Sequence, residues 1–243
     1  MARTLLSLWA WFVLGIVVII WVPLVALVWV VTVPFDKGRY WPGWLFRKLC
    51  VVHNWFNPLW RFRTSGVTID DPRHPYVVVS NHESFVDMLL ISHLPWEMKW
   101  LSKESMFKIP LVGWLMSMAG DIRLIRGNKQ SIVSAMHGCS DRLGKRTSVM
   151  LFPEGTRTRD GSLGEFKDGA FRIAIEHQVP IVPMAVTGTF QALQAGSWKM
   201  NVTDAEVRVL EPVPTEGLTK DDVPELRDRV RALIAGELET MRS

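Results

Sequence analysis

The sequence predicts an α/β fold, with a mixed, largely parallel sheet flanked by helices and an N-terminal apolar helical membrane anchor. From Tyr76 onward, short β-branched runs alternate with longer mixed segments, as in layered α/β proteins. Earlier in the chain, the stretch from Thr4 to Phe35 contains no charged residue. A chain of 243 residues has room for one soluble domain beside such an anchor. We therefore expect an anchor region at residues 1–63 and a catalytic domain at residues 64–243.

The apolar stretch permits two arrangements in a membrane. As one continuous helix, its 32 residues would be about 48 Å long, whereas the hydrocarbon core is about 30 Å thick. Pro23 removes a backbone donor in the middle of the stretch. We expect either a tilted, kinked spanning helix or two shorter helices in a re-entrant hairpin. The positive charge that follows predicts a cell-membrane location with the catalytic domain on the cytoplasmic face.

Basic and aromatic residues crowd together just after the apolar stretch. Residues 41–60 alternate the two characters, which is typical of a helix in the lipid headgroup layer, although these aromatics can also pack on the soluble domain. Anionic membrane lipid is therefore the expected partner. Nucleic acid is not, because eight of the twelve tryptophans lie within the first 60 positions. Cys50 and Cys139 lie far apart without zinc-ligand spacing and are expected to be reduced thiols.

The soluble domain is expected to contain five strands and four helices in alternation. The expected strands are residues 76–80, 99–102, 148–152, 181–186 and 206–210. The expected helices are residues 85–94, 130–143, 167–177 and 224–241. The last helix carries apolar side chains at spacings near 3.6 residues, so it is expected to cover one side of the sheet.

The first predicted strand is followed by the segment Ser-Asn-His-Glu-Ser-Phe-Val-Asp. His82 lies two residues beyond the end of that strand, so its ring is expected at the carboxyl edge of the sheet, where open α/β folds build their sites. Asp87 reaches His82 only if it lies in the first turn of the next helix. In one interpretation Asp87 only caps this helix, with Ser84 as N-cap. In the other, Asp87 fixes the tautomer of His82, whose second nitrogen takes a proton from a substrate hydroxyl.

A second polar segment, Phe-Pro-Glu-Gly-Thr-Arg at residues 152–157, ends the third predicted strand. Gly155 permits close backbone approach, Thr156 offers a hydroxyl, and Arg157 offers a planar fork that matches phosphate oxygens. A carboxylate beside a phosphate would repel it, so Glu154 is expected to orient Arg157 or to accept from a polyol hydroxyl. No serine or cysteine stands at a nucleophile elbow, which favours direct attack by the substrate alcohol.

Together these segments resemble the glycerolipid acyltransferase family. The His-x-x-x-x-Asp spacing and the Phe-Pro-Glu-Gly-Thr-Arg segment occur here in the family's order. The resemblance covers roughly residues 77–186, and three further blocks agree with it: residues 120–126, 166–170 and 179–183. Any one block is a weak signal, whereas the set in order is specific.

The resemblance implies a reaction and a role for each residue. It implies transfer of a fatty acyl group from acyl-CoA or acyl carrier protein to the sn-2 hydroxyl of lysophosphatidic acid, with no metal and no bound cofactor. His82 would be the base and Asp87 its orienting partner. The residues implied to bind the acceptor are Lys103, Arg126, Glu154, Gly155, Thr156 and Arg157. Met106, Met116 and Met118 either line a tunnel for the acyl chain or belong to the ordinary core.

One departure from the family pattern bears on the acceptor. The second motif usually carries an aromatic residue where this chain has Arg123, and a polar residue where it has Ile125. A swap of sides in that strand would let Arg123 compete with Arg126 for the phosphate. Another lysolipid as acceptor is therefore the main alternative, and a thioester hydrolase is a more distant one.

Overall fold

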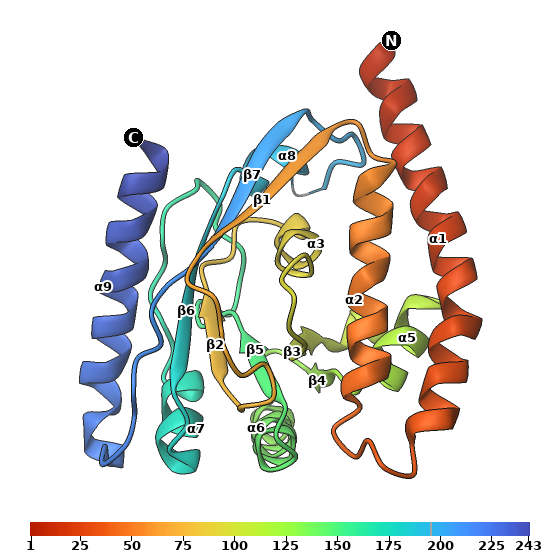
Figure 1. Ribbon diagram of the computed structural model, residues 1–243. Coiled ribbons are helices and arrows are strands. Elements are labelled where there is room, and N and C mark those ends of the chain that lie inside the picture. Colours follow the sequence, from red (N-terminus) through yellow and green to blue (C-terminus); the bar gives the residue numbers. More distant parts are fainter. Residues whose placement is uncertain (195) are drawn as a thin grey trace.

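The computed structural model describes residues 1–194 and 196–243. In this part of the chain one sheet of seven strands has the order β1-β7-β6-β2-β5-β3-β4 (Figure 1). The strands are β1 (Trp60–Gly66), β2 (Val77–Ser80), β3 (Met98–Lys103), β4 (Ile122–Leu124), β5 (Ser148–Leu151), β6 (Ile181–Thr187) and β7 (Thr203–Val209). β6, β2, β5, β3 and β4 are mutually parallel, whereas β7 is antiparallel to β6 and parallel to β1. The mixed, largely parallel sheet is confirmed.

The helices that flank the sheet differ in length, and the sequence pattern predicts the longer ones better than the short ones. They are α1 (Ala2–Thr32), α2 (Tyr40–Trp55), α3 (Val86–Ile91), α4 (Glu104–Phe107), α5 (Val112–Ala119), α6 (Lys129–Gly144), α7 (Gly169–His177), α8 (Thr189–Ala192) and α9 (Val223–Arg242). Each strand and helix expected in the soluble domain is present within a few residues. β1, β4 and the short helices α4, α5 and α8 were not expected, because short or exposed elements lack a clear hydrophobic period.

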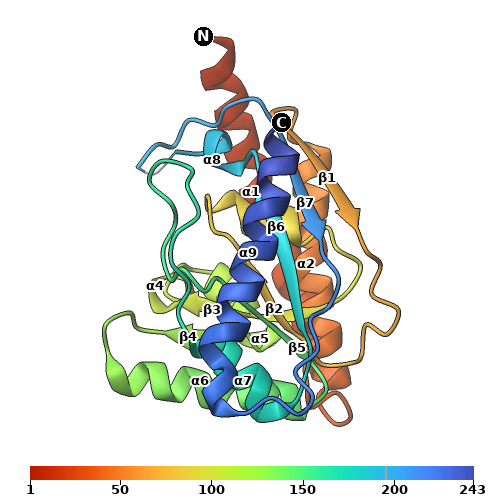
Figure 2. The same cartoon turned by 90° about the vertical axis from the view of Figure 1, so that its left-hand side faces the viewer.

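The alternation of side chains along the strands sorts the core into two layers. Val77 and Val79 of β2 pack on the side covered by α6, α7 and α9. Val78 points to the other side, where α3 covers it with Leu90 and Ile91. Figure 2 shows α9 lying across the sheet, as expected for the last helix. The parallel strands are buried on both faces, so their carboxyl ends are held rigidly in one row.

The N-terminal region forms a helical hairpin, but not the one expected from Pro23. α1 continues through Pro23 as one helix, so a break into two shorter helices within the apolar stretch is wrong. The hairpin is instead formed by α1 and α2, which lie side by side in Figure 1. α1 is long and apolar enough to cross a membrane, by length and composition. Its buried side packs on α2 and α5 through residues such as Val13, Val17 and Val25.

The basic and aromatic segment contacts the domain on one side and faces outward on the other. Within α2, Phe46 and Leu49 are buried, whereas Trp41 and Trp55 are exposed. The two interpretations of this segment are therefore compatible. The expected boundary between residues 63 and 64 falls inside β1, which pairs with β7 along its whole length. The sheet thus begins before that boundary, because an exposed edge strand gave no sequence signal.

Four charged side chains tie α2 to the sheet inside the protein. The Arg47 guanidinium donates to the Asp121 carboxylate, and the Lys99 ammonium donates to Glu97 Oε1 at 2.8 Å. Lys99 also donates to the Arg39 carbonyl at 2.6 Å. All four of the paired side chains are buried. Since an isolated buried charge is costly, each member depends on its partner, and the cluster fixes the α1–α2 hairpin against β3.

Loss of one cluster member should destabilise the protein strongly. We expect Asp121→Ala to lower the free energy of unfolding by about 3–5 kcal/mol, because Arg47 would stay buried without its carboxylate. Asp141→Ala is the matched control: it removes surface ion pairs to Lys145 and Arg142 and should cost no more than about 1 kcal/mol. Denaturant unfolding in detergent measures both variants. Equal stabilities would show that the cluster does not hold the hairpin in place.

Candidate active site

The carboxyl ends of the parallel strands bring the polar segments to one edge of the sheet. In spatial order, Thr189 follows β6, His82 follows β2, Arg157 follows β5, Lys103 ends β3 and Arg126 follows β4. These residues are far apart in sequence, yet strand order places them in a row. Four of these segments can therefore present a side chain to one substrate, whereas Thr189 is fully buried and bonded to Asp87.

His82 and Asp87 form a buried pair. His82 Nδ1 lies 2.7 Å from Asp87 Oδ2, and the two residues are 9% and 0% exposed. The same carboxylate oxygen accepts from the backbone N–H groups of Glu83 at 2.8 Å and Ser84 at 3.0 Å. Because Oδ2 serves as an acceptor, Nδ1 carries the ring proton and Nε2 is left as a base. Nε2 has no hydrogen-bond partner among the described residues.

Asp87 serves the helix and the histidine together. Its carboxylate reaches back to the Ser84 N–H, as in a capping box, but the N-cap of α3 is Phe85, and the Ser84 hydroxyl donates to the Leu193 carbonyl instead. The other carboxylate oxygen, Oδ1, accepts from the Thr189 hydroxyl. Asp87 thus caps the start of α3 and bonds His82 at the same time, whereas Ser84 is not the N-cap. Thr189 is a partner that the sequence did not reveal.

An aromatic ring supports His82 from one side. Phe152 stacks on the His82 ring with centroids 3.9 Å apart and planes 13° apart. Trp100 lies behind Phe152, at 6.0 Å between centroids. Stacking and the bond to Asp87 together restrict rotation of the imidazole. The ring therefore has one fixed orientation.

Glu154 holds the backbone of the site. Its Oε1 accepts from the His82 N–H at 2.7 Å, and its Oε2 accepts from the Gly164 N–H at 2.9 Å. Burial raises the pKa of this carboxyl, while the two N–H groups act against that rise. Both oxygens are occupied, and no ion pair joins Glu154 to Arg157 among the described residues. Glu154 therefore positions the His82 turn, a role that differs from the two expected for it.

The next three residues form an open, cationic loop. Gly155 has φ +72°, a backbone conformation that side-chain-bearing residues rarely adopt, so this turn favours glycine. Thr156 and Arg157 are exposed and line two adjoining hollows of about 460 and 600 Å³. Arg157 makes no ion pair within the described ranges. Its guanidinium is therefore available to an anionic ligand.

The cations on β3 and β4 differ in how they are held. Lys103 and Leu124 are paired in register, so Arg126 follows just beyond Lys103 at the same edge. Both cations are exposed. Arg123, by contrast, donates to the Ser117 hydroxyl at 3.2 Å and lies over the Phe107 ring. These contacts turn Arg123 toward α4 and α5, which leaves Arg126 as the better placed of the two arginines for an anion.

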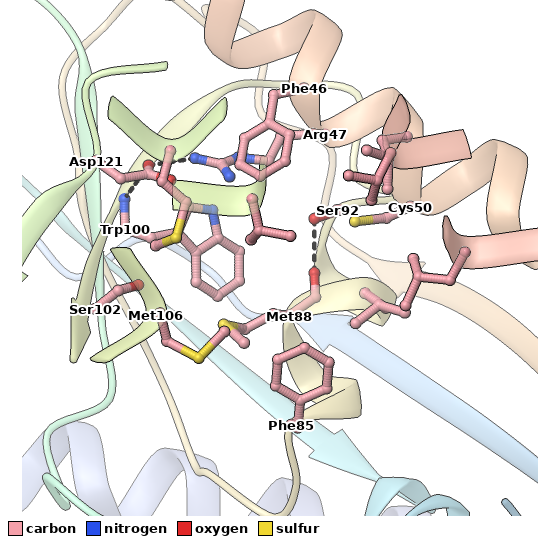
Figure 3. Close-up of a pocket in the computed structure, with 16 residues that line it drawn as sticks. Phe46, Arg47, Cys50, Phe85, Met88, Ser92, Trp100, Ser102, Met106 and Asp121 are labelled. Atoms are coloured by element: carbon pink, nitrogen blue, oxygen red, sulfur yellow. Dashed lines mark hydrogen bonds and ion pairs between the residues drawn. The ribbon is translucent and has the colours of Figure 1, made fainter. Parts of the chain in front are cut away.

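An apolar cavity of about 120 Å³ lies beside the site (Figure 3). Phe85 and Met88 of the α3 segment, Trp100 of β3 and Met106 of α4 point into it. Met116 also lines the cavity, so Met106 and Met116 fit the expectation of methionines beside an acyl chain. Met118 instead packs in the core beside α1 and α2. Since Trp100 contacts Phe152, the cavity lies two aromatic rings away from His82.

The fold is similar to that of a solved acyltransferase. The 1-acyl-sn-glycerophosphate acyltransferase PlsC of Thermotoga maritima matches with a TM-score of 0.83 and 23% sequence identity. The match covers 100% of this chain and 97% of that one. It therefore extends over the N-terminal hairpin as well as the sheet, and the predicted fold class stands in full.

Sequence relatives point to the same class. A 1-acyl-sn-glycerol-3-phosphate acyltransferase alpha of Homo sapiens is 36% identical over 197 residues, which are 80% of this chain and 70% of the human protein. A chloroplastic 1-acyl-sn-glycerol-3-phosphate acyltransferase of Brassica napus is 42% identical over 147 residues, 60% of this chain. This chain spans 42% of that protein and 50% of a chloroplastic Arabidopsis thaliana relative. An acyltransferase family model matches residues 61–187, and the chain belongs to the acyltransferase family.

The role of Glu154 leads to a prediction about stability and rate. Glu154→Gln keeps the shape but leaves one acceptor oxygen for two backbone N–H groups, which should cost about 1–3 kcal/mol and slow acyl transfer. Glu165→Gln is the control, because Glu165 is exposed on the same loop. Thermal unfolding and initial rates measure both effects. Wild-type values for Glu154→Gln would mean that its two hydrogen bonds do not support the His82 turn.

Proposed function

We propose that this protein is a 1-acylglycerol-3-phosphate O-acyltransferase. It moves a fatty acyl group from an acyl thioester to the sn-2 hydroxyl of lysophosphatidic acid and gives phosphatidic acid. One observation carries the proposal: the unbonded Nε2 of an Asp-held histidine lies on the same sheet edge as the exposed cation Arg157. The names of the relatives support the same activity.

The chemistry needs one base and no enzyme nucleophile. His82 Nε2 takes the proton of the sn-2 hydroxyl as its oxygen attacks the thioester carbonyl carbon. The tetrahedral intermediate collapses with cleavage of the carbon–sulfur bond, and the imidazolium returns its proton to the leaving thiolate. Asp87 stabilises the transient positive charge on the ring through Nδ1. His82 thus carries the single proton that moves from the hydroxyl to the leaving thiolate.

The phosphate of the acceptor would be held by the cations around the site. Arg157 offers a bidentate fork, whereas Lys103 and Arg126 offer charge from the neighbouring strands. Thr156 adds a hydroxyl beside Arg157. Holding the phosphate and the glycerol in place speeds the reaction by proximity, because the attacking oxygen is then fixed beside His82 Nε2.

The acyl chain would enter the apolar cavity between α3, β3 and the N-terminal hairpin. Its lining of aromatic and methionine side chains suits a flexible hydrocarbon chain. Acyl-CoA and acyl carrier protein present the same thioester, and either can serve as donor in this scheme. The cavity lies between the catalytic residues and α1, so the chain passes from the membrane side.

We propose that α1 anchors the domain to the cytoplasmic face of the cell membrane. The outward side of α1 exposes large apolar side chains along its length, including Leu8, Phe12, Ile19, Leu27 and Val30. Its other side packs on α2 and α5, which carry polar groups. This one-sided burial favours insertion into one leaflet, with anionic headgroups against Lys48 and the exposed basic residues that flank α2, Lys37 and Arg61.

A direct assay tests the proposed activity. Wild-type protein in detergent or vesicles should acylate lysophosphatidic acid with acyl-CoA, acyl carrier protein or both, and His82→Ala should lower the rate by about 100-fold or more. A panel with other lysolipids measures acceptor choice. Turnover of another lysolipid alone would reject lysophosphatidic acid as the acceptor, and thioester cleavage without any acceptor product would make the protein a hydrolase.

Removing Arg157 should damage recognition of the phosphate specifically. A charge-assisted hydrogen bond contributes about 1.5–3 kcal/mol, so kcat/KM of Arg157→Ala for lysophosphatidic acid should fall about tenfold to a hundredfold. Monoacylglycerol, which lacks the phosphate, is the matched control substrate, and its kcat/KM should change little. An equal fall for both acceptors would place the phosphate somewhere other than at Arg157.

A further inference from the structure

The last turn of α9 reaches back to the catalytic segment. Arg242 Nη2 donates to Glu83 Oε1 at 2.8 Å and to the Gly161 carbonyl at 2.9 Å. Glu83 directly follows the catalytic histidine and is 6% exposed. The Gly161 loop is itself tied to the site, because the Thr158 N–H donates to the His82 carbonyl at 2.8 Å. One guanidinium thus bridges the two loops that surround His82.

Glu83 and Asp87 are two buried carboxylates that share one hydroxyl. The Thr189 hydroxyl donates to Asp87 Oδ1 and also lies 3.3 Å from Glu83 Oε2. A threonine hydroxyl has one hydrogen, so the two carboxylates compete for it. Glu83 has other donors, Arg242 on Oε1 and the Phe190 N–H at 3.1 Å on Oε2. With these donors in place, the Thr189 hydrogen remains with Asp87.

The charges around Glu83 make Arg242 its principal counter-ion. Burial, and then the Asp87 carboxylate, raise the pKa of Glu83, whereas the Phe190 N–H and Arg242 act in the opposite direction. Arg157 and Arg159 line the adjoining hollow together with Glu83, but neither forms an ion pair with it in the described part of the chain. Without Arg242, the Glu83 carboxylate would accept the hydrogen bond from the Thr189 hydroxyl in place of Asp87.

We propose that Arg242 is a positioning residue for the catalytic pair, which acts through Glu83 and Thr189 to keep the Asp87 carboxylate oriented toward His82. Loss of Arg242 would turn the Thr189 hydroxyl toward Glu83 and leave Asp87 Oδ1 without its donor. The carboxylate would then be held through Oδ2 alone, so its plane could tilt and weaken the bond to His82 Nδ1. The proposal rests on the proposed function for its kinetic readout, and a spectroscopic readout tests it independently.

The kinetic test compares four variants. Arg242→Met should lower kcat for acyl transfer about tenfold with little change in KM, since the base is displaced while the phosphate site is intact. Arg242→Lys should recover part of the loss. The double variant E83Q/R242M should recover most of the lost kcat. The glutamine amide carries no charge, so it needs no counter-ion and competes less with Asp87 for the Thr189 hydroxyl. Arg229→Met is the control, since Arg229 is exposed on α9 with no ion pair among the described residues.

The outcomes separate a positioning role from a structural one. Thermal unfolding shows whether each variant is folded, and only folded variants enter the comparison. Equal kcat for Arg242→Met and Arg229→Met would overturn the proposal. So would a double variant as slow as Arg242→Met, because the need for Arg242 would then not arise from the Glu83 charge.

Proton NMR of histidine-labelled protein in detergent observes the hydrogen bond between His82 and Asp87 without any substrate. The ring N–H resonance of His82, assigned by its loss in His82→Gln, should shift or broaden in Arg242→Met and be kept in Arg229→Met and E83Q/R242M. An unchanged resonance in Arg242→Met would refute the positioning role. Absence of acyl transfer by the wild type would instead reject the proposed function, and the resonance would still decide the role of Arg242.

Discussion

The site depends on the bonds that converge on the Asp87 carboxylate. One oxygen accepts from the His82 ring and from two backbone N–H groups, and the other accepts from Thr189. A carboxylate with this many donors has one orientation. It therefore fixes the turn after β2, the first turn of α3 and the tautomer of His82 at once. A substitution at Asp87 would disturb all three.

Parallel strands make this local arrangement useful to a substrate. The register of β6, β2, β5, β3 and β4 sets the carboxyl ends in a row, and each end supplies a polar group. His82 lies second in that row, and Arg157, Lys103 and Arg126 lie on one side of it. The apolar cavity opens toward the hairpin of α1 and α2. A lipid with a charged head and an apolar chain matches this layout.

The sequence was sufficient for the motifs that are local. The His82–Asp87 pair, the glycine turn at Gly155 and the buried strands all carry signals within a few residues, and the structure contains each of them. The pairing of His82 with Asp87 was predictable because five positions across a strand-to-helix turn bring the side chains together.

Contacts made across long separations carried no such signal. Glu154 bonds the His82 backbone across 72 positions, and Arg242 bonds Glu83 across 159. Thr189 follows an ordinary strand, and only the adjacency of β6 and β2 brings it to Asp87. The sequence left open whether α1 continues through Pro23, and packing on α2 and α5 outweighs the loss of one backbone hydrogen bond.

The most direct test of the account is a crystal structure with lysophosphatidic acid bound and no acyl donor. It should place the sn-2 oxygen about 3 Å from His82 Nε2 while the phosphate contacts Arg157, since proton transfer needs hydrogen-bond reach. The donor-free complex cannot react, so it shows how lysophosphatidic acid is bound before acyl transfer. A phosphate bound away from Arg157, with the sn-2 hydroxyl out of reach of His82, would contradict the account.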